Sequence, residues 1–155
     1  MKKFELTTNT KMFLGKKLFQ IKALISFGDV EVGELGGYIE KEENLDYDGN
    51  AWVYGDACVY GNARVYGNAR VSGDACVSGN ACYTTIKGFG REYRTTTFFK
   101  CKDGKVRVQC GCFYGDLEEF RAIVKKTHGE SKKAKEYLMI ADLMELHFEE
   151  NENDK

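Results

Sequence analysis

Five hexapeptides follow one another without a break from residue 51 to residue 80: AWVYGD, ACVYGN, ARVYGN, ARVSGD and ACVSGN. Each has the form Ala-x-Val-Tyr/Ser-Gly-Asp/Asn. Side chains two residues apart share one face of a strand, so the alanines and valines point to the same side. The Gly-Asp or Gly-Asn pair then turns the chain, because these residues tolerate positive φ angles. Such a period of six predicts a parallel β-solenoid.

The same spacing continues beyond the five hexapeptides. One inward row then comprises Leu45, Ala51, Ala57, Ala63, Ala69, Ala75 and Ala81, and the row two residues on comprises Tyr47, Val53, Val59, Val65, Val71, Val77 and Tyr83. Three hexads would close a triangular coil of 18 residues, so residues 45–86 predict a little over two regular coils. Residues 30–44 contain parts of the pattern without its period. We expect them to form an atypical first coil, because terminal repeats cap a stack.

A β lead-in is predicted before the repeats, over residues 1–29. Residues Phe4–Thr7 and Leu18–Leu24 alternate between apolar and polar side chains, as half-buried strands do. Asn9 and Gly15 are expected to break the chain between these two strands.

A hairpin and two helices are predicted after the repeats. Residues 94–101 and 106–113 alternate as strands, and the Asp-Gly pair between them favours a tight turn. Asp116, followed three residues later by a glutamate, forms a capping box at the start of a helix that Gly129 ends. A second helix is predicted from about residue 131 to residue 148. The chain therefore divides into a β lead-in (1–29), a repeat region (30–86), a hairpin with two helices (87–148) and a charged tail (149–155).

Composition excludes some classes of partner. The 155 residues carry a formal net charge of -1, which disfavours a long nucleic acid or an anionic membrane as a partner. No apolar run approaches the roughly 18 residues of a membrane span. The first residues lack the apolar core of a signal peptide, so we expect a cytoplasmic location. The six cysteines are then expected to be reduced thiols.

The hexad array resembles the left-handed β-helix of hexapeptide-repeat proteins. Two further stretches, GELGGYIE at 33–40 and CGCFYGDLEEF at 110–120, extend the resemblance over most of the chain. Together with the array, they resemble small phage- and prophage-encoded proteins that join hexapeptide-like repeats to a β-hairpin and a helical tail. This resemblance implies a phage origin and the cytosol of a bacterial host. It also implies self-association, since hexapeptide-repeat proteins commonly form trimers.

We therefore predict a mainly β protein, built on a short left-handed parallel β-helix of triangular section. The β lead-in precedes this β-helix, and an α+β segment follows it. The few coils leave a small core of alanine and valine, which is marginal for stability by itself. We expect a homotrimer to bury the outward aromatic rows.

Outward positions carry the candidate binding residues. Residues 18 apart should stack about 4.8 Å apart, which places Arg64 over Asp46, Arg70 over Trp52, and Cys76 over Cys58. Guanidinium groups match phosphates, and aromatic rings stack on bases. The predicted ligand-binding residues are Trp52, Tyr54, Tyr60, Arg64, Tyr66 and Arg70, with Arg91 and Arg94 as the next cationic pair. In the alternative interpretation, the repeat arginines are structural partners of Asp46 and Trp52, and the thiols simply pack.

Three classes of function follow as hypotheses. The first is a non-enzymatic phage anti-defence protein that sequesters a small anionic, nucleotide-type immune signal at its subunit interfaces. The second is an inhibitor that binds a host defence protein through its tail or its flat faces. The third is an altered acyltransferase relative. The sequence argues against the third, because His128 and His147 lie outside the array where such enzymes carry their base.

No metal, cofactor or catalytic residue is predicted. Cys110 and Cys112 lie two apart on a strand, with Cys101 across the hairpin, but a lone Cys-Gly-Cys is a weak zinc signal. We expect free thiols at these positions.

Overall fold

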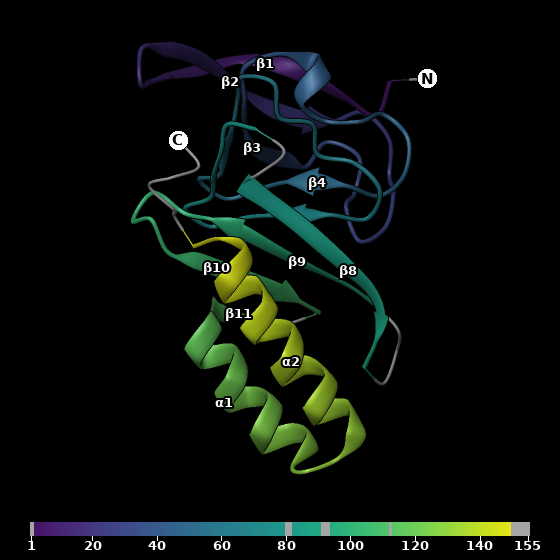
Figure 1. Ribbon diagram of the computed structural model, residues 1–155. Helices are drawn as coiled ribbons and strands as arrows, with labels where there is room; N and C mark the ends of the chain where they lie inside the picture. The colour runs from purple at the N-terminus through teal and green to yellow at the C-terminus, as the bar shows by residue number, and fades with distance from the viewer. Residues whose placement is uncertain (1, 80–81, 91–93, 112, 150–155) are drawn as a thin grey trace.

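The computed structural model describes residues 2–79, 82–90, 94–111 and 113–149. The protein is mainly β and ends in a pair of helices. Figure 1 shows the N-terminal strands and the repeats at one end, the helices at the other, and a twisted sheet between them. None of the described helices has the length and apolar character needed to cross a membrane.

The lead-in is a β-hairpin, as predicted, with longer strands than expected. Strand β1 (Phe4–Phe13) pairs antiparallel with β2 (Lys16–Ala23), and β2 pairs antiparallel with β3 (Leu35–Ile39). The prediction that Asn9 breaks the chain was wrong. The pairing register shifts between Leu6 and Thr10, and the Asn9 amide donates to the Gln20 side chain within this irregular stretch. The strand bulges there and continues.

The repeats form strips of short parallel strands. In the first strip β3 pairs with β5 (Cys58–Val59) and β5 with β7 (Cys76–Val77); in the second strip β4 (Trp52–Val53) pairs with β6 (Arg70–Val71). A parallel bridge between Leu45 and Val65 marks the third strip. Trp52 lies opposite Arg70 and Cys58 opposite Cys76, each pair 18 residues apart. The predicted spacing of these rungs is confirmed.

The first coil is longer than the second. Tyr38 pairs with Cys58 and Leu45 pairs with Val65, each 20 residues on. Leu45 therefore belongs to the valine row, and its predicted place in the alanine row was wrong. The two extra residues are absorbed before Asn50, whose N–H donates to the Gly67 carbonyl at the 17-residue spacing of the regular coils. The six-residue period is local, so it cannot detect an insertion before the first regular hexad.

Side chains of the same chain close the open end of the stack. The Lys3 ammonium donates to the Ala51 carbonyl at 2.7 Å, and the Asn44 amide donates to the Ala63 carbonyl at 2.8 Å. Lys3 is buried, and burial lowers the pKa of its ammonium to about 8. These donors occupy the positions that backbone N–H groups of a preceding coil would fill, so the strand edges there are covered. The 3₁₀ turn η1 (Glu42–Asn44) places Asn44 for this role.

The array ends earlier than predicted. Strand β8 (Tyr83–Phe89) pairs antiparallel with β9 (Arg94–Lys100), so the predicted extension of the coils to residue 86 was wrong. Strands β10 (Val106–Cys110) and β11 (Phe113–Asp116) complete a sheet in the order β11-β10-β9-β8. Tyr83 stays in the repeat core and donates from its hydroxyl to the Arg64 carbonyl, which closes the second end of the stack.

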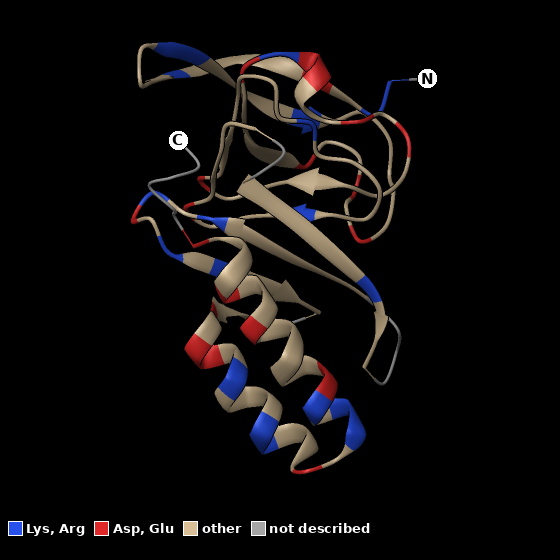
Figure 2. Ribbon diagram, viewed as in Figure 1, with Lys and Arg blue, Asp and Glu red and all other residues tan. Residues whose placement is uncertain are grey.

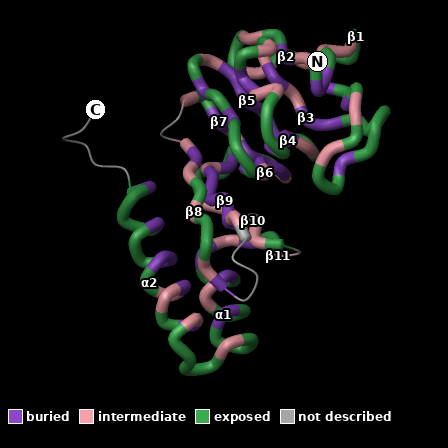
Figure 3. The backbone as a smooth tube through the Cα atoms, turned by 90° about the vertical axis from the view of Figure 1, so that its right-hand side faces the viewer, coloured by how far each residue is buried: buried purple, intermediate pink, exposed green. Residues whose placement is uncertain are grey.

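The two predicted helices are confirmed, with their caps. Helix α1 (Leu117–His128) begins at the Asp116 capping box, and helix α2 (Lys132–His147) begins at Ser131. Both pack on the face of the sheet opposite the repeats, because Phe98 contributes to the helix-side core while its neighbour Phe99 contributes to the repeat core. Figure 3 shows this alternation as buried positions along β9 and along one side of each helix.

Candidate functional site

Two of the predicted binding residues are sealed inside the chain. Trp52 is 1% exposed, and its ring meets Phe27 edge-on with centroids 5.3 Å apart. Tyr60 packs edge-on against Phe13 at 5.7 Å, and burial raises the pKa of Tyr60 to about 12. The expectation that these aromatic rings lie on an open surface was wrong. The lead-in covers them, so their burial does not require further copies of the chain.

Arg70 connects the lead-in to the repeats. Its guanidinium lies over the Tyr54 ring, 5.2 Å from the centroid, and forms an ion pair with Asp29. The hydrogen bond from Arg70 holds the pKa of the Asp29 carboxyl below its usual range. The Arg70 backbone N–H donates to the Thr97 hydroxyl at 3.0 Å, so the same residue also contacts the sheet. These contacts match the alternative interpretation, in which Arg70 is a structural partner.

The Arg70→Ala variant is therefore expected to lose stability. The change removes a cation–π contact and a partly exposed ion pair, which together contribute about 1 kcal/mol. For a chain of this size, that corresponds to a melting temperature lower by roughly 2–4 °C. Arg64→Ala is the matched control, because the Arg64 side chain is 62% exposed and its change should lie within about 0.5 kcal/mol. Equal melting temperatures for the two variants would contradict the structural role of Arg70.

Arg64 and Tyr66 are the predicted binding residues that lie on the open surface. Tyr66 is 59% exposed, and Arg64 lies 3.3 Å from Asp46, as the rung spacing predicted. Arg91 lies outside the described residues, and Arg94 begins β9 with a side chain that is not described.

The predicted residues do not form one site. Trp52 and Arg70 belong to the second strip, Tyr60 follows β5 of the first strip, and Arg64 lies beside the bridge of the third strip. In a three-sided coil, consecutive hexads occupy different sides, and only positions one full coil apart share a side. A row that is continuous in the sequence is therefore distributed around the stack.

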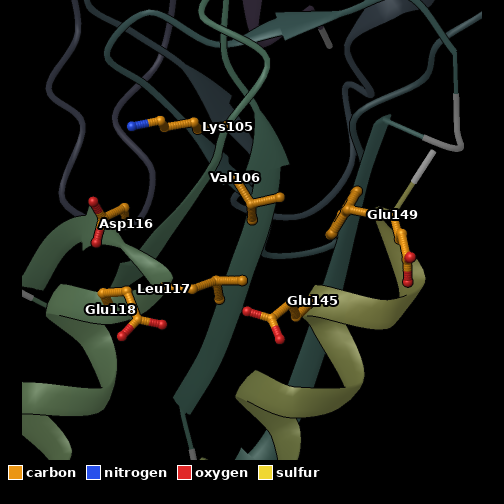
Figure 4. A pocket seen from close by; sticks show the side chains of 8 residues that line it. Lys105, Val106, Asp116, Leu117, Glu118, Glu145 and Glu149 are labelled. Carbon is orange, nitrogen blue, oxygen red and sulfur yellow. The ribbon is translucent and has the colours of Figure 1, made fainter.

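A cleft of about 530 Å³ lies where the sheet meets the helices, at a place that the sequence did not indicate. We call it the acidic cleft. Its lining comprises Lys105, Val106, Asp116, Leu117, Glu118, Glu145, Phe148 and Glu149. In Figure 4, Leu117 of α1 and Glu145 of α2 point toward one another across the opening. Apolar side chains thus lie at its base and carboxylates around it.

Arg121 holds the acidic side chains of the two helices together. This guanidinium forms ion pairs with Glu118, with Asp142 at 2.9 Å and with Glu145 at 3.3 Å. Asp116 accepts from the Glu119 N–H at 2.8 Å and so begins α1 at the edge of the cleft. The remaining lone pairs of Glu118 and Glu145 are exposed to solvent, which leaves them able to accept from a cationic group.

Metal-binding chemistry has no support among the described side chains. No group of three His, Cys, Asp or Glu residues lies close enough to hold a metal ion in the described part of the chain. Cys58, Cys76, Cys82, Cys101 and Cys110 are free thiols. The buried Cys101 has a pKa raised by burial to about 11, so it is not an activated nucleophile. Cys112 of the weak zinc signal lies outside the described residues.

Comparison with known proteins assigns no family. No protein-family model matches the chain, and no curated protein matches it. The chemistry of the exposed surfaces is therefore the basis for a function.

Proposed function

We propose that the protein is a non-enzymatic binding protein whose acidic cleft receives a basic, partly apolar segment of another protein. The observation that carries this proposal is the apolar base of Val106, Leu117 and Phe148 beneath a rim of carboxylates. Lysine and arginine side chains have apolar stems and charged heads. Their stems fit the base of the cleft, and their heads fit the carboxylates of Glu118 and Glu145.

This function is the second of the three classes that the sequence suggested. Two features favour it over sequestration of a nucleotide: Trp52 is buried, and Arg70 is engaged with Asp29. The resemblance to phage-encoded proteins supplies the setting that we propose, an inhibitor of a host defence protein in the bacterial cytosol. For the scaffold we propose a left-handed parallel β-helix over residues 35–79, which the 18-residue spacing of parallel pairs supports.

A labelled peptide of alternating arginine and leucine tests the cleft. The double variant Glu118→Gln with Glu145→Gln should bind this peptide at least about 10-fold more weakly, a loss of roughly 1.4 kcal/mol. The affinity of the unaltered protein should also fall as salt is added, because exposed ion pairs are screened. Fluorescence anisotropy measures both effects.

The matched control is Glu5→Gln with Glu31→Gln, which removes the same charge from exposed positions of the lead-in. It should leave the affinity unchanged. Equal weakening by the control would reduce the effect to net charge. A glutamate–leucine peptide that binds as well as the arginine–leucine peptide would exclude the proposed chemistry.

A small anionic ligand is the second candidate, because Arg64 and Tyr66 are both exposed on the surface of the repeats. In this alternative, further copies of the chain would enclose the ligand. A cyclic dinucleotide that raises the melting temperature of the unaltered protein, but not of Arg64→Ala, would favour it.

A further inference from the structure

Helix α2 has an apolar stripe on the side that faces away from its own chain. Met139, Leu143 and Leu146 follow the i, i+4, i+7 spacing and are 72%, 55% and 66% exposed. Tyr137 and Met144, on the opposite side, are buried in the helix-side core. The helix is therefore apolar on both sides, although the chain covers only one. The outer side of α2 is exposed in Figure 3.

The charges along α2 are divided between its two ends. Lys132, Lys133 and Lys135 lie in its first turn, where no acidic residue is present, and Asp142 and Glu145 lie in its second half. Figure 2 shows this division as blue near the loop between the helices and red toward the sheet. The helix dipole favours the opposite arrangement, with acidic groups at the N-terminus and basic groups at the C-terminus. The observed order is thus unfavourable within one helix.

The same order is favourable between two α2 helices that run antiparallel. Each basic end then lies beside an acidic end, whereas a parallel pair would place like charges together. The stripe has a matching symmetry, because Met139 and Leu146 lie at nearly equal distances on either side of the Asp142–Leu143 step. The surface that complements α2 in charge and in shape is therefore α2 itself, turned end to end.

We propose that a second copy of this chain covers the α2 stripe in a twofold-symmetric dimer. Leu143 lies at the axis against the second copy's Leu143, and Met139 lies against the second copy's Leu146. Lys135 lies beside the second copy's Glu149. Such an interface is isologous and closes on itself, so it yields dimers and not filaments. The proposal does not depend on the partner of the acidic cleft.

Sedimentation equilibrium over a range of protein concentrations tests this dimer. The mass should rise from 17.6 kDa toward twice that value. Leu143→Glu places two carboxylates at the axis and should weaken association at least about 10-fold. The variant should keep its circular dichroism spectrum, since Leu143 is exposed and glutamate is a good helix former. Leu14→Glu, at another exposed leucine in the β1–β2 turn, is the control and should not change the mass.

A charge exchange tests the antiparallel orientation. Lys135→Glu and Glu149→Lys should each weaken the dimer by about 5-fold, and the two changes combined should restore it, because they recreate an opposite-charge pair. Failure of the combined variant to recover would overturn the antiparallel arrangement. A chain that stays at monomer mass at every concentration, or that reaches trimer mass, would overturn the dimer. Peptide binding by Leu143→Glu should be unchanged, so this proposal and the acidic cleft fail separately.

Discussion

Val65→Asp is expected to leave no folded protein. Val65 is completely buried in the repeat core, and its backbone bridges to Leu45 of the preceding coil. An unpaired charge at such a position costs several kcal/mol, against a total stability of about 5–15 kcal/mol for a protein of this kind. The strips are only two or three strands deep, so the coil cannot rearrange around the carboxylate. The circular dichroism spectrum and the melting curve of the purified variant report the result.

Tyr66→Asp is the control for this experiment. It introduces the same carboxylate at the next residue, whose side chain is exposed, and it should fold. A soluble, cooperatively melting Val65→Asp would mean that the inward and outward positions of the hexads are exchanged.

Trp52→Ala should lower the free energy of unfolding by about 3–5 kcal/mol, as expected for a large aromatic side chain removed from a core. The ring fills the space between the first coil and the lead-in. A Cβ placed on Gly36 of β3 would lie only 2.8 Å from it, which shows how closely the two layers approach. The cavity left by alanine cannot close, because Phe27 and β3 are held by their own contacts. Urea denaturation measures the loss.

Trp52→Phe separates the packing role from a polar role. The indole N–H of Trp52 has no hydrogen-bond partner among the described residues, so phenylalanine should retain most of the stability. Should Trp52→Ala melt like the unaltered protein yet lose affinity for a cyclic dinucleotide, the ligand-binding role predicted from the sequence would be supported over the structural one.

Local features of the chain were predictable from the sequence. The capping box of Asp116 requires only residues three apart, and the turns after each valine need only their own glycine and its neighbour. The pairing of Trp52 with Arg70 follows from the period, since equal coils bring residues 18 apart into register. These interactions involve short stretches, or exact repetition of them, and a sequence records both directly.

Features at the ends of the array were not predictable in this way. Leu45 moved into the valine row because the first coil contains two more residues than the next. Tyr83 left the coil because its strand gains more backbone hydrogen bonds by pairing with β9 than a last, unpaired rung would offer. In both places the register depends on which segment covers the end of the stack, and the repeat carries no information about that segment.

The sequence by itself determined the strands, the turns and the helix caps, because their causes lie within a few residues. Only the tertiary structure decided which side chains face solvent. Trp52 has the same slot as Arg64 in the hexad, yet it is buried, because the lead-in packs on one side of the coil and not on another. The acidic cleft joins Val106, Leu117 and Glu145, which are far apart in the chain. Packing of the helices on the sheet creates this cleft, and no local pattern encodes it.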